Sequence, residues 1–246
     1  MFDQRLLSTL KKIIPQFIQK RIDPFEALGN SFLKKANEET SPDALVLDAG
    51  AGECEHKAFF NGKKYISIDF AEGDASYNYR NLSIIGDLHK LPFKDNIFEI
   101  AINIVVLEHL REPKDALKEL YRVIKPGGLL YIKVPFCWEE HQYPYDFFRF
   151  TSFGLRYLLE ASKFEVISLE PIGGFFWLLG RRLMGVLQFF QEGWKYIFFL
   201  LLAPIFGLFL PIACYYLDHF DKERNYTMGY LCIAQRPEKY GELSKE

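Results

Sequence analysis

Short apolar runs alternate with amphipathic segments along the middle of the chain, which is the pattern of strands and helices in turn. The runs that predict strands are residues 44–49, 64–70, 82–86, 98–106, 129–134 and 164–169. Apolar residues at helical spacing predict a helix over 112–123, ended by the turn at 125–128. Thr151 is a candidate N-cap for a helix through Ser162. The alternation predicts an α/β protein with a parallel, doubly wound sheet and ligands at the carboxyl ends of its strands.

The N-terminal stretch has an apolar face and a basic face. Its apolar residues, spaced by three and four, are Phe2, Leu6, Leu7, Leu10, Ile13, Ile14, Phe17 and Ile18. Its basic residues are Arg5, Lys11, Lys12, Lys20 and Arg21, and the lysines interrupt any apolar core that a signal peptide needs. This predicts an amphipathic helix, kinked near Pro15. Two roles stay open: a packing or lid helix of the domain, or a helix lying on an anionic membrane surface.

A second apolar region, residues 173–222, precedes a strand predicted at 227–235. No charged residue occurs from Tyr196 to Leu217, a length that approaches a membrane span. Strands of one sheet on both sides argue against a single span, and Pro204, Gly207 and Pro211 are expected to break such a helix. We expect a helical hairpin that dips into one leaflet; a buried cap or dimer interface and a true span are the alternatives. Its interfacial anchors would be Trp177, Arg181, Arg182, Trp194 and Lys195.

Charge and cysteine spacing argue against a nucleic-acid partner, a metal site and a disulfide framework. The formal net charge is -2, and no stripe of basic residues is interleaved with stacking aromatics, so no nucleic-acid partner is expected. The four cysteines lie far apart without a C-x-x-C pair or matching histidines. We therefore expect neither a metal site nor a disulfide framework, and a reducing, cytoplasmic setting.

A glycine-rich loop follows the first predicted strand, in Leu45-Val46-Leu47-Asp48-Ala49-Gly50-Ala51-Gly52-Glu53. Glycines in this strand-to-helix turn let the backbone approach a ligand without a Cβ in the way, and amides at a helix N-terminus suit an anion. A nicotinamide fingerprint needs a third glycine three positions past Gly52, where Glu55 stands. That mismatch counts against a nicotinamide-dependent reductase.

Two later acids narrow the choice of ligand. Asp69 closes the second predicted strand, where a carboxylate can accept both hydroxyls of an adenosine ribose. Asp87 follows the third strand, where an acid and neighbouring backbone can address an adenine amino group. Each acid alone reads as an ordinary strand-end residue. Together with Asp48, in order at successive strand ends, they indicate an adenosine-containing cofactor.

The segment from Ala44 to Phe136 resembles the class I S-adenosylmethionine (SAM)-dependent methyltransferases, in particular the small-molecule methyltransferase type 11 group. Its matching text is LVLDAGAGE, YISIDF, GDLHKLPFKDNIFEIAINIVVLEHL and ELYRVIKPGGLLYIKVPF. The resemblance implies SAM as cofactor, held by Asp48, Gly50, Gly52, Asp69, Phe70, Asp87, Leu88 and Asn103. Cys54 and Glu99 depart from the usual glycine and aspartate of the group.

The resemblance also implies a fold and a domain organisation. The expected fold is a Rossmann-like, mostly parallel seven-stranded sheet with an antiparallel last strand, plus a hydrophobic helical insertion before that strand. The expected divisions are an amphipathic helical segment at 1–36, a SAM-binding core at 37–172, the insertion at 173–222, and the last core strand with a polar tail at 223–246.

Candidate acceptor-site residues follow the fourth and fifth strands. Our first choice of general base is His141, with Glu108 and His109 as further catalytic candidates. Tyr145, Asp146 and Arg149, within PYDFFRFT, would shape the acceptor pocket. A structural role for the Glu108-His109 pair and an exposed loop position for His141 are the plain alternatives.

The function expected from the sequence is methyl transfer from SAM to a small or lipid-linked acceptor at the cytoplasmic membrane face. Such an acceptor could be a polyprenyl-linked glycan, a lipid or a quinone-like ring. The alternative from another class is a non-catalytic SAM-binding or scaffold protein of a membrane-associated biosynthetic complex. The oligomeric state stays open.

Overall fold

A computed structural model describes residues 15–73 and 77–238 of the chain. These residues form two compact units, which we call the helical unit (15–30 with 171–229) and the sheet unit (31–170 with 230–238). Most of the amphipathic helix predicted from Phe2 to Ile18 lies outside the described residues. Its last part belongs to helix α2 (Gln16–Ile22).

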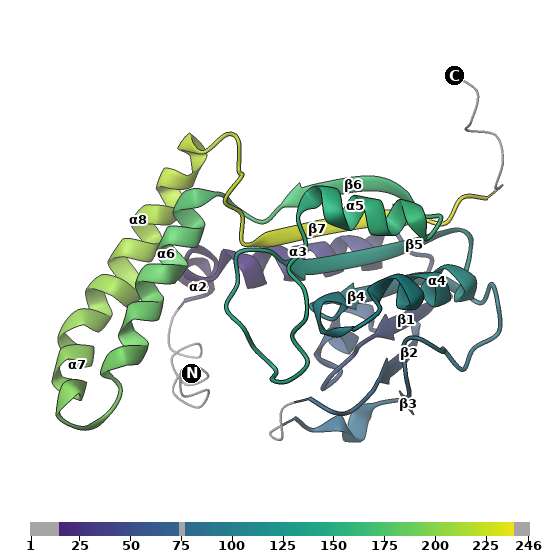
Figure 1. Ribbon diagram of the computed structural model, residues 1–246, viewed down its shortest axis with the longest axis horizontal. Helices are drawn as coiled ribbons and strands as arrows, with labels where there is room; N and C mark the ends of the chain where they lie inside the picture. Colours follow the sequence, from purple (N-terminus) through teal and green to yellow (C-terminus); the bar gives the residue numbers. More distant parts are fainter. Residues whose placement is uncertain (1–14, 74–76, 239–246) are drawn as a thin grey trace. The chain divides into compact units, whose positions relative to one another are not determined.

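Seven strands form one sheet in the order β3-β2-β1-β4-β5-β7-β6 (Figure 1). They are β1 (Leu45–Ala49), β2 (Lys64–Asp69), β3 (Ile84–Ile85), β4 (Phe98–Ile104), β5 (Ile124–Pro135), β6 (Glu165–Pro171) and β7 (Gly229–Gln235). Buried aliphatic runs explain the central strands: β1 and β4 are covered on both faces, as parallel strands require. Strand β1 pairs in parallel with both β2 and β4, and β5 pairs in parallel with β4.

The last strand runs the other way. Gly127, near the start of β5, donates its amide to Arg236 O at 2.7 Å, just past the end of β7. Ile172, just past the end of β6, donates to Gly229 O at the start of β7 at 2.8 Å. Strand β7 is therefore antiparallel to both neighbours, which confirms the predicted Rossmann-like fold with its hydrophobic helical insertion before the last strand.

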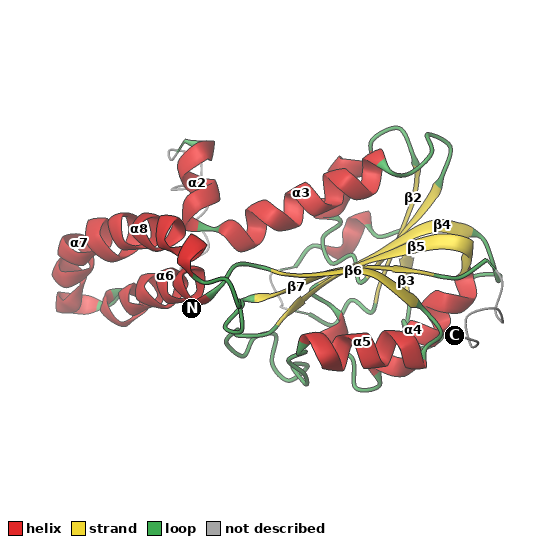
Figure 2. Cartoon of the chain, turned by 90° about the horizontal axis from the view of Figure 1, so that it is seen from above, coloured by secondary structure: helices red, strands yellow, loops and turns green. Residues whose placement is uncertain are grey.

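Helices cover both faces of the sheet. Figure 2 shows α3 (Pro24–Glu38) on one side and α4 (Pro113–Val123) with α5 (Ser152–Ala161) on the other. Residues 31–38 of α3 belong to the sheet unit, where the Phe32 ring packs on Tyr131 of β5 with ring centroids 4.9 Å apart. On the opposite face, the apolar stripe of α4 is fully buried in the core cluster through Leu117 and Leu120.

Short 3-10 and π segments complete the elements. They are η1 (Glu55–Phe60), η2 (Tyr79–Asn81), η3 (Leu107–His109), η4 (Val186–Phe190), η5 (Gly193–Lys195), the π segment η6 (Ile205–Phe209) and η7 (Asp218–Phe220).

The predicted turn at 125–128 lies inside β5 and does not precede it. Ile124 already pairs with Phe98, and pairing resumes between Leu129 and Ile100. Four residues of β5 therefore face one residue of β4, a bulge that Gly127 supports with a φ of +79°. The helix ends at Val123 as predicted, but strand β5 begins at the next residue.

The helical unit contains a helical hairpin. Helix α6 (Phe175–Gly185) forms one arm, and α7 (Tyr196–Pro204) with α8 (Leu210–Leu217) forms the other, packed along α6 (Figure 1). The two arms pack closely where the Cα of Gly180 faces Cys214 and Pro211. Buried Asp218 joins the ends of the hairpin by accepting hydrogen bonds from the amides of Gly174 and Trp177 at the start of α6.

The prediction that Pro204, Gly207 and Pro211 break the second arm is wrong. The chain stays helical from Tyr196 to Leu217 through the π segment η6, where Leu210 N donates to Ile205 O five residues earlier. A π turn widens the helix locally, so the prolines are accommodated where an unbroken α-helix would clash with them.

One helical stretch of the described residues, Gly193–Phe220, is long and apolar enough to cross a membrane by length and composition. A core helix of a soluble protein meets these criteria too, but most of such a helix is buried. Here 17% of the apolar window is buried. Trp194 at the tip is exposed, whereas Trp177 stacks on Tyr215 at 5.3 Å and lies inside the hairpin.

The N-cap of α5 gives a direct test of the sheet unit. Thr151 Oγ1 accepts the amide of Gly154 at 3.0 Å. We expect Thr151→Ala to lower the free energy of unfolding by about 1 kcal/mol, because this amide then lacks its partner. Thr151→Ser keeps the hydroxyl and is expected to lose much less. Urea denaturation of the two variants measures the difference, and equal stability of both would contradict the cap.

Candidate functional site

The loop after β1 lies against the turn that follows β4. Gly50 has a φ of +91°, and a Cβ there would lie 2.4 Å from both methyl groups of Val106. Its amide donates to Ile68 O of β2 at 2.8 Å. Only glycine fits this conformation and this approach, so Gly50 fixes the loop where β1, β2 and β4 end.

The second glycine of the loop contacts the acid at the end of β2. Gly52 N donates to Asp69 Oδ2 at 2.9 Å, and Ala71 N donates to Asp69 Oδ1 at 2.8 Å. Gly52 has a φ of +50°, and a Cβ there would meet no atom within 4 Å. The carboxylate is thus oriented by two amides beside open space, and each oxygen keeps a lone pair for another donor.

A long helix does not follow this loop. The segment after Cys54 is the six-residue 3-10 helix η1, so the expected helix N-terminus with its anion-binding amides is absent from this turn of the described chain. Cys54 has a φ of +64°, the conformation that the glycine usual at this position adopts without strain. Its side chain is buried, and burial raises the pKa of its thiol.

Asp48 is a fully buried acid in β1. Its Oδ2 accepts hydrogen bonds from the Tyr65 hydroxyl and from His56 Nδ1, the latter at 3.1 Å. Burial alone would lower the pKa of His56, but the hydrogen bond and charge of Asp48 outweigh it, so this pKa lies above its ordinary value. Burial and the Asp48 charge raise the pKa of Tyr65.

Two buried oxygens near the ends of β1 and β4 have no hydrogen-bond partner among the described residues. They are Asp48 Oδ1 and Asn103 Oδ1, and the Asn103 side chain also donates to Ala49 O at 2.9 Å. Unpaired buried acceptors carry a desolvation cost. The register of β1 and β4 pairs Asp48 with Ile102, so the Asp48 and Asn103 side chains lie on opposite faces of the sheet.

The remaining candidate cofactor residues follow β2 and β3. Asp87 Oδ1 accepts the amide of His89 at 2.9 Å and lies 2.6 Å from its ring Nδ1. Burial opposes ionisation of Asp87, but these hydrogen bonds keep its pKa below the usual range. Leu88 is buried, and Phe70 is exposed beside Asp69. An acid and two apolar side chains thus lie at the strand ends where the sequence placed an adenosine.

The turn after β4 carries backbone strain. Val105 has a φ of +57°, which is rare for a β-branched residue, and its amide donates to Lys133 O at 2.8 Å. The turn leads directly into η3, which contains Glu108 and His109. Such strain at a strand end is typical of functional sites.

Glu108, His109 and His141 converge beside this turn. One ligand atom from each lies within 4.8 Å of the others, and the two imidazole rings meet edge to face at 4.7 Å. Glu108 is fully buried, and neither of its oxygens has a hydrogen-bond partner among the described residues. Burial raises the pKa of Glu108 to about 8. The structure therefore brings together all candidate catalytic residues of the sequence.

Asp146 and Arg149 support this cluster. The carboxylate of Asp146 receives two guanidinium contacts of 2.6 Å from Arg149 and the amide of His141 at 2.8 Å. Burial opposes ionisation of Asp146, but the Arg149 guanidinium and the His141 amide lower its pKa to about 2. Both residues were predicted to shape an acceptor pocket, and here they hold the loop that carries His141.

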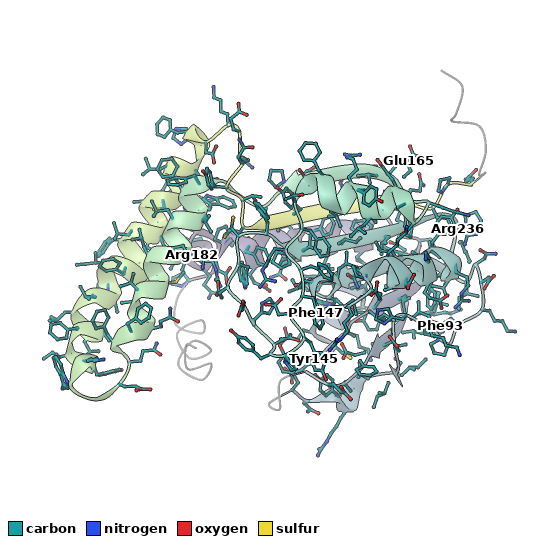
Figure 3. The ribbon with its side chains drawn as sticks, in the orientation of Figure 1. Phe93, Tyr145, Phe147, Glu165, Arg182 and Arg236 are labelled. Atoms are coloured by element: carbon teal, nitrogen blue, oxygen red, sulfur yellow. The ribbon has the colours of Figure 1, made fainter. Side chains whose placement is uncertain are left out.

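Tyr145 belongs to the same loop, which follows β5; Figure 3 labels it together with Phe147. Its hydroxyl donates to Glu72 Oε2 at 3.0 Å, and its carbonyl faces His109 Nδ1 at 2.7 Å. Sequence reasoning missed His56 and Tyr65, the partners of Asp48. Nothing local identifies them, because they reach Asp48 from η1 and from the neighbouring strand.

The His56–Asp48 pair predicts a pH dependence of stability. Because the folded pKa of His56 is raised, its stabilising charge is present below the unfolded pKa and is lost as the pH rises through the folded value. We expect His56→Ala to lower the free energy of unfolding by about 2 kcal/mol at pH 6 and by less at pH 9. Urea denaturation at both pH values measures this, with His219→Ala, an exposed histidine of the helical unit, as control. An equal loss at both pH values would mean that His56 is neutral in the folded protein.

The family model and two of the curated relatives that match this chain are described as methyltransferases. Residues 47–132 match the family described as a methyltransferase domain. The chain is 36% identical over 97 residues to demethylmenaquinone methyltransferase of Renibacterium salmoninarum, a match to 37% of this chain and 41% of that protein. It is 37% identical over 84 residues to the ubiquinone/menaquinone biosynthesis C-methyltransferase UbiE of Ruegeria sp., a match to 34% and 29% of the two chains. The chain thus spans less than half the length of these curated relatives.

Solved structures agree in fold. A putative sarcosine dimethylglycine methyltransferase from Galdieria sulphuraria aligns with a TM-score of 0.55 at 17% identity, over 88% of this chain and 85% of that one. The [4+2]-cyclase SpnF aligns with a TM-score of 0.56 at 22% identity, over 85% and 80%. Since proteins described by different reactions share this architecture, these likenesses establish the fold alone. The family model and the curated relatives add the cofactor class: residues 47–132 are identified as a methyltransferase domain that uses SAM.

Proposed function

We propose that the chain transfers the methyl group of SAM to a small or lipid-linked acceptor, of which a quinone-like ring is the favoured class, at the cytoplasmic face of a membrane. The names of the curated relatives favour a quinone-like acceptor. The observation that carries the proposal is the meeting, within the sheet unit, of a cofactor-type loop at Gly50 and Gly52 with the Glu108–His109–His141 cluster. They are joined by the contact of Gly50 with the turn after β4.

The cofactor side of this proposal rests on four polar groups. Asp69, oriented by its two amides, would accept the ribose hydroxyls, and Asp87 would address the adenine amino group. Asp48 and Asn103, near the ends of β1 and β4, would offer their unpartnered oxygens to separate polar groups of the methionine part. When bound, SAM supplies a methyl group on a sulfonium whose sulfur leaves with the bonding electron pair. The chain's own task is then to align the acceptor, exclude water and handle the acceptor proton.

If the methyl acceptor is a hydroxyl, a residue of the Glu108–His109–His141 cluster must take its proton. His141 Nδ1 lies 3.2 Å from Glu139 O, a carbonyl that only accepts, so Nδ1 carries the proton and Nε2 has a free lone pair. His141 Nε2 is therefore the available base, and Asp146 with Arg149 positions its loop.

The membrane part of the proposal rests on the helical unit. The second hairpin arm and the hairpin tip expose apolar side chains over most of their length, including Phe189, Trp194, Ile197, Leu200, Leu201 and Phe209. Exposed basic residues, Arg182 and Lys195, lie in the same unit. Apolar surface with flanking basic and tryptophan side chains is typical of segments that lie in a membrane interface.

The position of the cofactor is tested by a pair of glycines. A Cβ at Gly52 (φ +50°) or at Gly62 (φ +88°) meets no protein atom within 4 Å, so alanine imposes backbone strain and no clash with the protein at either position. If SAM lies against Gly52, Gly52→Ala is expected to weaken SAM binding by at least about tenfold, whereas Gly62→Ala leaves it unchanged. Isothermal titration calorimetry with SAM measures both. Equal affinities would place the cofactor elsewhere.

The activity and its membrane setting are tested in one assay. The full chain is mixed with tritium-labelled SAM and vesicles of phosphatidylcholine, phosphatidylglycerol and bacterial membrane lipid extract. We expect label in the lipid phase and S-adenosylhomocysteine in the aqueous phase. The double variant Leu200→Glu/Leu201→Glu, at side chains 58% and 65% exposed, is expected to lower the transfer by about tenfold, because the charges oppose insertion.

The control for this assay is Phe153→Glu/Tyr157→Glu, which puts the same charges on exposed apolar positions of α5 in the sheet unit. It is expected to transfer label like the parent chain. SAM affinity should be unchanged in both double variants. SAM binding without formation of S-adenosylhomocysteine under any of these conditions would favour a non-catalytic scaffold. Transfer that is insensitive to the hairpin charges would overturn the membrane setting alone.

A further inference from the structure

We infer that Glu108, His109 and His141 form a binding site for a divalent transition-metal ion on the acceptor side of the sheet unit. Two imidazole nitrogens and one carboxylate oxygen are a donor set that suits zinc, iron, cobalt or manganese. The sequence spacing predicts no metal site here, because two of the ligands are adjacent and the third lies more than thirty residues later. Folding alone brings them together.

The spacing of the donor atoms fits one shared ion. His109 Nε2 lies 3.8 Å and His141 Nε2 lies 4.0 Å from Glu108 Oε1. Two donors that each lie about 2.1 Å from one ion can be at most about 4.2 Å apart. All three donor atoms fall within 4.8 Å of one another, so a small inward rotation of the imidazoles suffices for coordination.

The hydrogen bonds around the cluster leave the three donor atoms available. His109 Nδ1 donates to Tyr145 O at 2.7 Å, and His141 Nδ1 faces Glu139 O at 3.2 Å. Both rings therefore carry their proton on Nδ1 and turn the Nε2 lone pair toward Glu108. An imidazole that donates one N–H to a backbone carbonyl while its other nitrogen binds a metal is the arrangement that orients histidine ligands in metalloproteins.

The burial of Glu108 is a second, independent observation that supports a bound cation. Glu108 is fully buried, and both of its oxygens and the Nε2 atoms of both histidines lack a hydrogen-bond partner among the described residues. Arg149 donates no hydrogen bond to this carboxylate, because its guanidinium is held by Asp146 at 2.6 Å on both nitrogens, and its charge acts on Glu108 only through space. A buried acid that accepts no hydrogen bond is costly, and a coordinated cation removes that cost.

The site also specifies the acceptor, and this step rests on the proposed function. Three protein ligands leave coordination positions open. A hydroxyl oxygen of the acceptor would take one of them and lose its proton to solvent, because a bound divalent ion lowers the pKa of a coordinated hydroxyl. The inference thus names an acceptor with a ring or chain hydroxyl next to the reacting atom. With the ion bound, the histidine Nε2 atoms carry metal, and the ion takes over the role otherwise given to His141 as base.

Metal binding is tested on the full chain, without an affinity tag and treated with chelator, by titration with Co²⁺. We expect one equivalent to bind with visible d–d absorption, without the thiolate charge-transfer band that binding to a cysteine would give. Bound Co²⁺ is expected to raise the thermal unfolding midpoint. Glu108→Gln and His141→Ala are each expected to weaken binding by at least about tenfold and to abolish the shift of the midpoint. His219→Ala, which removes an exposed histidine of the helical unit, is expected to bind like the parent chain.

SAM titration of the same chelator-treated chain separates this inference from the proposed function. We expect SAM affinity to be unchanged by metal removal, by Glu108→Gln and by His141→Ala. Binding of Co²⁺ without binding of SAM would retain the metal site and overturn the methyltransferase proposal. Absence of stoichiometric Co²⁺ binding, or binding that Glu108→Gln and His141→Ala leave intact, would overturn the metal site and return His141 to the role of base.

Discussion

The contact between Gly50 and Val106 is the constraint on which both halves of the site depend. Strands β1 and β4 are neighbouring parallel strands, so the chain turns out of both at the same edge of the sheet. The two turns can share that edge because Gly50 lacks the Cβ that would collide with Val106. One turn presents Gly52 to Asp69, and the other leads through strained Val105 to Glu108 and His109. The glycine loop and the Glu108–His109–His141 cluster are thus held at this edge by one packing contact.

Buried polar groups divide this edge into two environments. At β1, Asp48 is paired with Tyr65 and His56, and only one of its oxygens lacks a partner. At the turn after β4, Glu108 has no hydrogen-bond partner for either oxygen, although the neighbouring acid Asp146 is fully compensated by Arg149. The fold thus satisfies Asp146 and leaves Glu108 as a buried acid without a hydrogen-bond partner among the described residues.

In the helical unit, the sequence predicted the presence of the helices correctly but their breaks wrongly. Apolar composition and the position between two strands of one sheet were enough to predict a helical insertion before the last strand. The helix-breaking rule for Pro204 and Pro211 failed, because a π turn at Ile205–Phe209, between the two prolines, keeps the chain helical. The same failure of a local rule occurs at 125–128, where pairing of Ile124 with Phe98 turns an expected loop into a bulged strand. Strand pairing overrides the turn propensity at 125–128, and a change of helix type accommodates the prolines of the hairpin arm. The expected divisions at 36, 172 and 222 stay predictions beside the units that the structure shows.

The sequence by itself determined the order of the seven strands along the chain, the glycine loop with Asp69 and Asp87, and the candidate residues of the acceptor side. These features are local: hydrophobic periodicity, turn residues and motif spacing are written in consecutive positions. Only the tertiary structure decided that Glu108, His109 and His141 meet, that Asp146 and Arg149 support them, and that His56 and Tyr65 pair with Asp48. Those contacts join residues from different elements, and their distances depend on how strands pair and loops pack, which no single stretch of sequence encodes.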